Sequence, residues 1–492
     1  MSNPLALLPL AVAAGGGRIS AAGDSAADFE AQQLIAAGLT LLQRSAPLVR
    51  ALSGRRSAIL LPTSPTYLTA LAASDGRGAV LINPLAAPAE IAFQCADANV
   101  GAIFTTSAFA ARLPAGVATV LLDSAPLRAT VVADGRTAEV DLGSHHGLSL
   151  EGERDVEGRD EEVAVVYTSA MRGTALGAAV SHRNLIANAR STIEALDITS
   201  SEHVLAVLPF AHLFGLTVTA SAPLMVGGRV TTMERFNPLK AVDLMMNGVT
   251  LLVGVPAVYH ALLTTIIRKG VDLRDSTLRL SICGGAALPI ELQDRWADTT
   301  GHELRQGYGL TEAGPVCLVN RVDRPNVRGT MGTALPGVDV SIFPPARYDN
   351  GATDEPEVAA LPDGAEGEIC VRGENVFSGY LHDAPGLPRR GAWLCTGDRG
   401  LREPDGSVRF LGLLKPMFTR NGFNVYPREV ERVVGTMPGV TRVEASSVPD
   451  PAKENDVILR VFGNVTEEDV KRWCEERLSA YKQPSVIEIV PG

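Results

Sequence analysis

The segment of the sequence with the clearest chemical potential is a loop rich in hydroxyl groups and glycine. Residues 165–177 read Val-Val-Tyr-Thr-Ser-Ala-Met-Arg-Gly-Thr-Ala-Leu-Gly, and Ser-His-Arg-Asn follows at 181–184. A strand that leads into such a loop and then into a helix can place backbone N–H groups around phosphate oxygens. Most loops of this composition are plain turns, so this one alone does not identify a phosphate site.

Further short motifs follow this loop in a fixed order. Each motif alone could be an ordinary turn or loop. A lone histidine among apolar residues, such as His212, usually belongs to a hydrophobic core. Their combination and order are not plausibly a matter of chance. The motifs occupy residues 208–215, 283–289, 306–312, 329–337, 367–373 with 379–380, 393–398 and 415–431.

In this order the motifs resemble those of the adenylate-forming superfamily, which includes AMP-forming acyl- and aryl-CoA synthetases, peptide-synthetase adenylation domains and luciferases. The resemblance extends from about Arg56 to Tyr481. The acid–CoA ligase branch is the most similar, because residues 424–429 read Asn-Val-Tyr-Pro-Arg-Glu and the sequence contains no carrier-protein domain. The resemblance implies that a carboxylate attacks the α-phosphate of ATP, giving an acyl-adenylate, and that CoA then displaces AMP.

The resemblance also implies a nucleotide site. Thr168, Ser169 and Gly173 would wrap the β- and γ-phosphates. Tyr308 would stack on the adenine, which Gly285, Ala286 and Ala287 would line, and Asp398 would accept both ribose hydroxyls. The full expected set is Thr168, Ser169, Gly173, Gly285, Ala286, Ala287, Gly307, Tyr308, Thr311, Asp398 and Lys415.

The expected catalytic group is His212, Thr311 and Glu312. Thr311 would bond the α-phosphate, and Glu312 would hold Mg²⁺, a hard cation that prefers oxygen ligands. His212 would lie near the acyl carboxylate and gate the pocket. The expected acyl site consists of His212, Phe214, Val255, Pro256 and Gly309, and its apolar character favours a fatty or aryl acid.

The sequence departs from the family pattern in the phosphate loop, which in the family reads Tyr-Thr-Ser-Gly-Thr-Thr-Gly-x-Pro-Lys-Gly. Here Ala170, Met171 and Arg172 replace Gly-Thr-Thr, while Ala175 and Leu176 replace Pro-Lys. Two hydroxyls and one ammonium that would contact pyrophosphate are therefore lost. Arg172 could restore one positive charge from another place in the loop.

The family hinge and the terminal lysine also differ. The hinge motif Gly-Arg-x-Lys-Asp is here Gly412-Leu-Leu-Lys-Pro416, so Leu413 replaces a ribose-binding arginine. Pro416 has a locked φ and should restrict rotation at the pivot. The family's Gly-Lys segment after Tyr-Lys-x-Pro does not occur in the sequence, so its catalytic lysine is either missing or lies in a further part of the chain.

Three functions therefore stay open. The first is an active AMP-forming acid–CoA ligase for a fatty or aryl acid, using ATP, Mg²⁺ and CoA, in which Arg172, Lys415 or Lys482 compensates for the lost groups. The second is a nucleotide- or acyl-binding paralogue that no longer adenylates and acts as a regulator or partner subunit. The third reuses the fold for another acyl or adenylate step.

The elements that must position these residues are those of an α/β protein. Short apolar runs alternate with helical patterns over most of the chain, which predicts a parallel sheet covered on both faces. Beyond Gly329, short strands with turn signals predict a β-rich unit, and residues 123–161 predict an irregular surface insertion. The expected parts are a large N-terminal domain at 1–411 with a β-rich subdomain at about 329–411, a hinge at 412–416 and a small α+β domain at 417–492.

The composition excludes several classes of protein. Hydrophobic residues make up 46% and charged residues 20% of the 492 residues, so the chain is not disordered. A net charge of −11 disfavours nucleic acid as a partner. The six widely spaced cysteines predict reduced thiols in the cytoplasm rather than disulfides or a zinc site. No apolar run is long enough for a membrane helix, the N-terminal apolar stretch lacks the basic region of a signal peptide, and the oligomeric state stays open.

Overall fold

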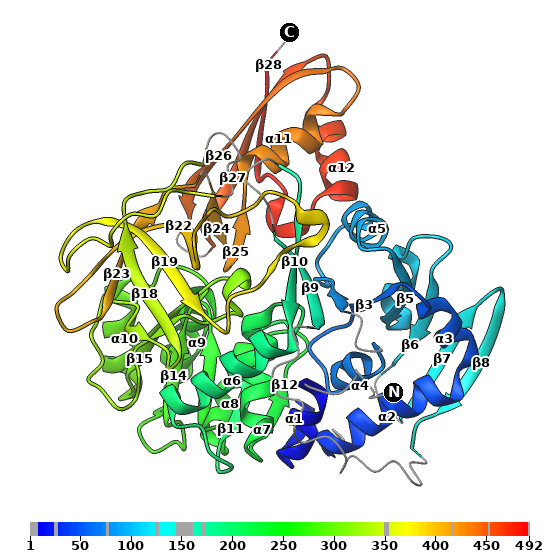
Figure 1. The fold of residues 1–492 in the computed structure, drawn as a ribbon, viewed down its shortest axis with the longest axis horizontal. Helices are drawn as coiled ribbons and strands as arrows, with labels where there is room; N and C mark the ends of the chain where they lie inside the picture. Colours follow the sequence, from blue (N-terminus) through cyan, green and yellow to red (C-terminus); the bar gives the residue numbers. More distant parts are fainter. Residues whose placement is uncertain are drawn as a thin grey trace.

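The structure is a computed structural model that describes residues 8–23, 28–74, 78–123, 127–143, 161–168, 173–348, 354–415, 417–450 and 453–490. Ser169 and Arg172 of the phosphate loop, with Ala170 and Met171 between them, lie outside the described residues, as does Pro416 of the hinge. The described strands form two nine-stranded sheets and three smaller ones (Figure 1). This mixed α/β architecture, with a β-rich part, confirms the fold class predicted from the sequence.

The first large sheet carries three of the motifs, 208–215, 283–289 and 306–312, at the carboxyl ends of its parallel strands. Its order is β17-β16-β15-β14-β13-β11-β12-β1-β2, and β1, β12, β11, β13, β14 and β15 run parallel. The apolar runs of the sequence predict four of these strands, β11, β12, β13 and β14, and β13 and β14 are buried at every residue. The bounds are β1 Arg18–Ala21, β2 Asp28–Glu30, β11 His203–Ala206, β12 Arg229–Thr232, β13 Leu251–Gly254, β14 Leu280–Cys283, β15 Leu304–Tyr308, β16 Leu318–Val319 and β17 Thr333–Ala334.

The second large sheet presents the hairpin that ends in the phosphate loop. Its order is β20-β10-β9-β4-β3-β5-β6-β7-β8, and β9 pairs antiparallel with β10 on either side of that loop. The bounds are β3 Arg56–Leu60, β4 Ala79–Leu81, β5 Val100–Thr105, β6 Ala118–Leu121, β7 Arg128–Ala133, β8 Arg136–Asp141, β9 Glu162–Thr168, β10 Leu176–Ser181 and β20 Gly379–Tyr380.

The prediction of an irregular insertion at 123–161 is wrong for residues 128–141. There β7 and β8 form a regular antiparallel hairpin at the edge of the second sheet. Asp134 and Gly135 both have positive φ values, 52° and 69°, as the tight turn of a two-residue hairpin requires. The Asp134-Gly135 pair is typical of a hairpin turn. The polar residues around it favoured the prediction of an irregular loop instead.

Helices cover the sheets, and local capping explains where several of them begin and end. Ser181 accepts a hydrogen bond from Asn184 N at the start of α6, and Asn237 accepts one from Lys240 N at the start of α8. Gly270, with φ of 64°, ends α9. The bounds are α1 Leu8–Ala14, α2 Ala31–Arg44, α3 Ala46–Leu52, α4 Thr66–Ala72, α5 Pro88–Asp97, α6 His182–Leu196, α7 Ala222–Met225, α8 Pro238–Met246, α9 Pro256–Lys269 and α10 Ile290–Thr300.

Two smaller parts complete the described chain. A five-stranded sheet contains β18 Val338–Phe343, β19 Gly367–Gly373, β21 Arg389–Arg390, β22 Trp393–Arg402 and β23 Val408–Leu413. The last part, here named the C-terminal unit (residues 417–450 and 453–490), has its own core of Phe418, Val425, Val430, Val434, Val457, Leu459, Val461, Val470, Cys474 and Leu478. Its elements are β24 Phe418–Arg420, β25 Phe423–Val425, α11 Pro427–Gly435, β26 Val440–Asp450, β27 Glu454–Gly463, α12 Glu467–Arg477 and β28 Val486–Val490.

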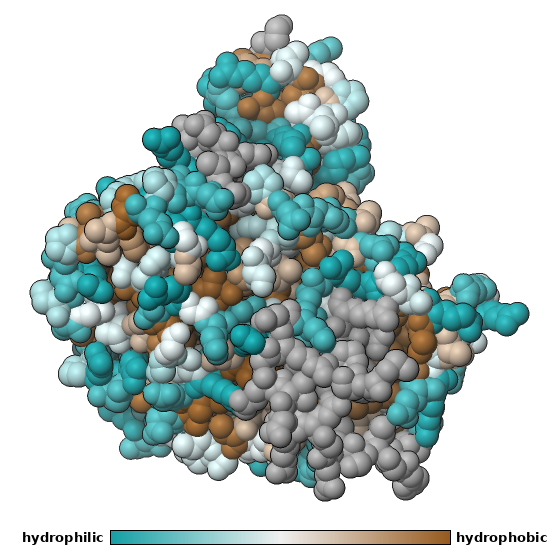
Figure 2. Space-filling view, in the orientation of Figure 1, coloured by the Kyte–Doolittle hydropathy of each residue, from teal (hydrophilic) through white to brown (hydrophobic). Residues whose placement is uncertain are grey.

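The C-terminal unit, orange to red in Figure 1, lies beyond the loop end of β9 and β10. On the face shown in Figure 2, hydrophilic side chains dominate, with apolar patches between them. Among the described residues, no helix is both long and apolar enough to cross a membrane.

Candidate active site

A cavity of about 680 Å³ is bordered by both large sheets, the five-stranded sheet and the C-terminal unit. It lies at the carboxyl ends of β14 and β15, where ligands bind in open parallel sheets. Because the carboxyl ends of neighbouring parallel strands meet at one edge, the motifs at 283–289 and 306–312 become neighbours. Of the expected site residues, the cavity wall includes Thr168, His212, Phe214, Gly285, Ala286, Ala287, Gly307, Tyr308, Gly309, Thr311, Glu312, Asp398 and Lys415.

Three other expected residues that the structure describes, Val255, Pro256 and Gly173, do not line this cavity. Val255 lies behind its wall, between Gly285 and Gly422 of the C-terminal unit. Pro256 is buried in the first turn of α9. Gly173 packs against the start of α11, and Ser169 lies outside the described residues.

Asp398 is held by two side chains in the cavity wall. The Tyr308 hydroxyl donates to Asp398 Oδ2 at 2.6 Å, and Lys415 Nζ lies 3.5 Å from Asp398 Oδ1. Lys415 also donates to the carbonyl oxygen of Thr396 at 2.8 Å. Burial lowers the pKa of Lys415, but the negative charges of Asp398 and its other neighbours outweigh this and raise that pKa overall. The ammonium is therefore charged and fixes the carboxylate in the cavity.

Glu312 lies where two hydroxyl groups converge on one of its oxygens. Thr168 Oγ1 donates to Glu312 Oε1 at 3.0 Å, and the Tyr380 hydroxyl donates to the same atom at 2.8 Å. Tyr380 reaches this place because β20 pairs with β10, with Tyr380 opposite Ala178. A carboxylate surrounded by hydroxyl oxygens has the chemistry that suits Mg²⁺. Tyr380 was absent from the expected site, although the Gly379-Tyr380 motif was its sequence signal.

His212 lies at the cavity wall with its imidazole in a fixed tautomer. Phe214 N donates to His212 Nδ1 at 3.2 Å, so the ring proton is assigned to Nε2. Burial lowers the pKa of His212 to about 4. The imidazole is therefore neutral near pH 7 and can offer one N–H donor. The Phe214 ring contacts Gly284 and forms an apolar part of the same wall.

Lys482, one of the lysines expected to compensate for the lost cations, is bound by two carboxylates. Its Nζ donates to Glu90 Oε1 at 2.8 Å and to Glu429 Oε1 at 2.7 Å. Burial lowers the pKa of Lys482, while the electrostatic effects of the Tyr481 hydroxyl and of the negative Glu429 and Glu90 raise it by more. Glu90 belongs to α5 and Glu429 to α11, so this cluster joins the C-terminal unit to the large part of the protein. The sequence offered no signal for Glu90.

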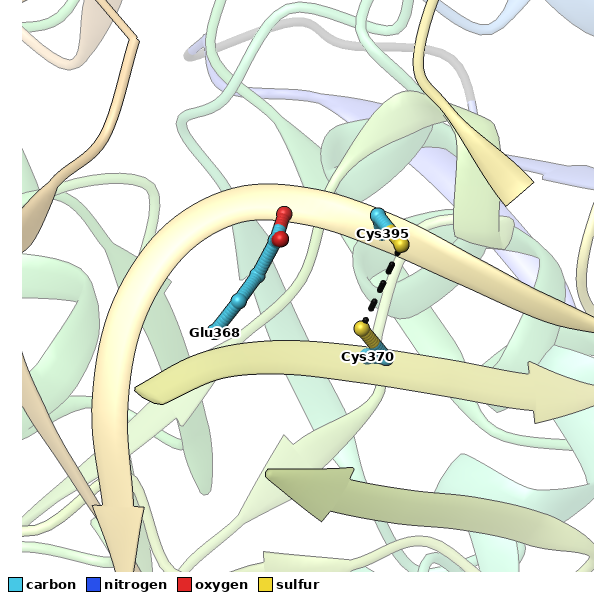
Figure 3. A group of neighbouring side chains, drawn as sticks. All are labelled: Glu368, Cys370 and Cys395. Atoms are coloured by element: carbon cyan, nitrogen blue, oxygen red, sulfur yellow. Dashed lines mark hydrogen bonds between the residues drawn. The ribbon is translucent and has the colours of Figure 1, made fainter. Parts of the chain in front are cut away.

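A second group of ligand-type side chains lies on β19 and on β22, the strand that also carries Asp398 (Figure 3). One ligand atom each of Glu368, Cys370 and Cys395 lies within 4.8 Å of the others, and the two sulfurs are 3.5 Å apart. Glu368 already accepts hydrogen bonds from Ala346 N at 2.6 Å, Gly397 N at 2.8 Å and the Tyr348 hydroxyl. Burial raises the pKa of Glu368, and these three donors oppose that rise. The carboxylate thus fixes the strand that carries Asp398.

Comparison with known proteins identifies the family. The AMP-binding enzyme family matches residues 48–381. A long-chain-fatty-acid–CoA ligase of Escherichia coli O6:H1 is 29% identical, over 88% of this chain and 82% of the relative. A feruloyl-CoA synthase of Amycolatopsis sp is 32% identical, over 88% of this chain and 84% of the relative.

Solved structures agree. A malonyl-CoA ligase with methylmalonyl-CoA and AMP bound has a TM-score of 0.79 at 25% identity, covering 100% of this chain and 99% of that one. ATP-bound MatB from Rhodopseudomonas palustris has a TM-score of 0.67 at 26% identity, covering 98% and 94%. The chain therefore belongs to the AMP-binding enzyme family and is an enzyme of its acid–CoA ligase group.

Proposed function

We propose that this chain joins an apolar carboxylic acid, fatty or aryl, to CoA through an acyl-adenylate. The observation that carries the proposal is the single cavity that combines the Tyr308–Asp398 pair, Glu312 and the apolar wall at Phe214. The named relatives act on long-chain fatty acids and on feruloyl groups, and a 4-coumarate–CoA ligase of Humulus lupulus is 28% identical. These relatives support both acid classes.

Each residue has a part in the proposed reaction. Asp398, held by Tyr308 and Lys415, accepts the ribose hydroxyls of ATP, and Thr311 binds the α-phosphate. Glu312, positioned by Thr168 and Tyr380, would hold Mg²⁺, which supplies charge neutralisation on the phosphate oxygens. The neutral His212 donates its Nε2 proton to the acyl carboxylate as a hydrogen bond and orients the attacking oxygen.

The proposed parts of the chain are those expected from the sequence: a large domain at 1–411, a hinge at 412–416 and a small domain at 417–492. The separate core of the C-terminal unit supports this division. The proposed compartment is the cytoplasm, and the six cysteines, all buried and free, support it.

The test is a substrate panel with ATP, Mg²⁺ and CoA. Long-chain fatty acids, ferulate and 4-coumarate should give AMP and the acyl-CoA, whereas acetate should give little because it leaves the apolar wall unfilled. Chromatography of the thioester and of AMP gives the result. A protein that binds ATP but forms neither AMP nor thioester with any acid of the panel contradicts the proposal.

A second candidate is the paralogue that binds ligands without adenylating. Leu176 and Leu413 favour it, since both line the cavity where the family has a lysine and an arginine. This candidate predicts pyrophosphate release far below the usual enzyme range of about 1–1,000 per second, together with acyl transfer to CoA from a preformed acyl-adenylate. Leu176→Lys should then raise pyrophosphate release without changing the transfer step.

A further inference from the structure

Arg432, on α11 of the C-terminal unit, reaches the end of the phosphate loop. Its Nε donates to the carbonyl oxygen of Gly173 at 2.6 Å. Gly173 has φ of +81°, and a Cβ at this position would lie 2.8 Å from the carbonyl oxygen of Arg428. The backbone of the loop end and the first turn of α11 are therefore in direct contact, and this contact brings the Arg432 guanidinium to the loop.

The guanidinium retains donors for a ligand. Arginine carries five N–H donors, of which the Gly173 contact uses one. Within the described ranges, no carboxylate lies close enough to pair with Arg432, whereas Lys415 and Lys482 both have carboxylate partners. Arg432 is exposed and lines the cavity. It is thus a cation at the loop side of the cavity whose charge no described side chain neutralises.

Leu176 shows why such a cation matters at this place. It begins β10, directly beyond the phosphate loop, and it lines the same cavity as Arg432. An isobutyl group cannot bind phosphate oxygens, so β10 supplies no charge there. A guanidinium, by contrast, binds adjacent phosphate oxygens through parallel N–H bonds.

We propose that Arg432 is a diphosphate-binding residue, delivered to the phosphate loop from the C-terminal unit. The diphosphate belongs to ATP or to CoA. These two ligands come from the proposed function, on which the inference rests. The loop side of the site is then complete only when α11 contacts Gly173. Because Arg432 belongs to the C-terminal unit, diphosphate binding depends on the position of that unit.

The test is calorimetry of Arg432→Gln with pyrophosphate, ATP, AMP, CoA and pantetheine. Loss of a charge-assisted bond should weaken binding of the ligand that supplies the diphosphate by about tenfold. AMP and pantetheine lack a diphosphate and should bind unchanged. Weaker ATP and pyrophosphate with unchanged CoA identifies ATP as the source, and the reverse identifies CoA; either result supports the assignment. Arg472→Gln is the matched control, since Arg472 is an exposed arginine of α12 paired with Asp469.

A second variant separates charge from folding. If ATP is the source, Leu176→Lys added to Arg432→Gln should restore ATP and pyrophosphate affinity. The assignment is overturned if Arg432→Gln binds every probe with the affinity of the parent. It is also overturned if Arg432→Gln weakens AMP binding as much as it weakens ATP binding, or if only the Arg172→Gln variant loses affinity for the diphosphate ligands. A parent protein that binds none of the probes overturns the proposed function together with this inference, whereas selective failure of Arg432→Gln leaves the proposed function standing.

Discussion

The Asp398 carboxylate contacts two side chains, those of Tyr308 and Lys415, without a ligand. These contacts determine the effect of replacing it. It is 7% exposed, accepts from Tyr308 and lies opposite the charged Lys415. Preorganised acceptors lose little entropy when a ribose binds, because their positions are already fixed. At the scale of single residues, the site is thus built by neighbours that orient the binding groups.

Asp398→Asn should weaken AMP binding by at least about tenfold, since a neutral amide replaces an acceptor for two hydroxyls and leaves Lys415 without its charge partner. Calorimetry with AMP measures the change. Asp339→Asn is the control, because Asp339 is an exposed carboxylate paired with Arg372 on the same sheet. Equal AMP affinity in the two variants would refute the role of Asp398.

His212 makes the folded state sensitive to acid. Its pKa falls from 6.5 to about 4 on burial, so the unfolded chain binds the proton more readily between these values. The stability from this group is complete above about pH 6.5 and is lost as the pH falls towards 4, with a loss of about 2 kcal/mol by pH 5. Thermal unfolding at pH 7 and pH 5 should show a smaller acid shift for His212→Gln than for the parent. An equal shift in both proteins would contradict the buried neutral imidazole.

At the scale of elements, the segment around β17 depends on close backbone packing. Gly332 and Gly337 have nearly equal φ values, +79° and +76°, but different surroundings. A Cβ at Gly332 would lie 2.1 Å from the backbone of Val319 on β16, whereas a Cβ at Gly337 meets nothing within 4 Å. The two glycines therefore separate the cost of conformation from the cost of packing.

Gly337→Ala should cost about 1 kcal/mol, the conformational penalty alone. Gly332→Ala should cost several times more, because β16 and β17 must separate to admit the methyl group. Chemical denaturation compares the two variants. Equal losses of stability would mean that the β16–β17 contact is looser than the structure shows.

At the scale of the whole molecule, the cluster of Lys482, Glu90 and Glu429 joins the C-terminal unit to α5. Because Lys482 and Glu429 both belong to the C-terminal unit, Glu90 is the member of this cluster that links the unit to the large part. Ser479 strengthens it through a hydrogen bond to Glu90. Removing one partner of a buried ion pair commonly costs about 3–5 kcal/mol when the other charge is left unpaired. The loss in Glu90→Gln should be smaller, because Lys482 keeps Glu429.

Glu90→Gln should release the C-terminal unit while leaving its own core intact. Limited proteolysis should then cut faster near residues 413–419, and the thermal transition of the large part should change little. Glu291→Gln is the control, because Glu291 is an exposed carboxylate of α10 outside the cavity wall. Unchanged cleavage in Glu90→Gln would show that other contacts hold the C-terminal unit.

The sequence by itself determined the class of fold and named many of the residues that line the cavity. Apolar runs of strand length between helical patterns are a local property, so β3, β4 and β5 and four strands of the first sheet, β11, β12, β13 and β14, are predicted near their observed places. Motifs such as 306–312 carry their chemistry in adjacent residues, which is why Tyr308, Thr311 and Glu312 were named without a structure.

Only the tertiary structure decided which groups meet across the chain. Tyr380 reaches Glu312 because β20 pairs with β10, and Glu90 reaches Lys482 because α5 packs beside the C-terminal unit. It also showed that Lys415 and Lys482 are bound by carboxylates, while Arg432 contacts the phosphate loop. Such partners are separated by tens to hundreds of residues, and side-chain charges at that separation are paired by packing geometry, which local sequence patterns do not encode.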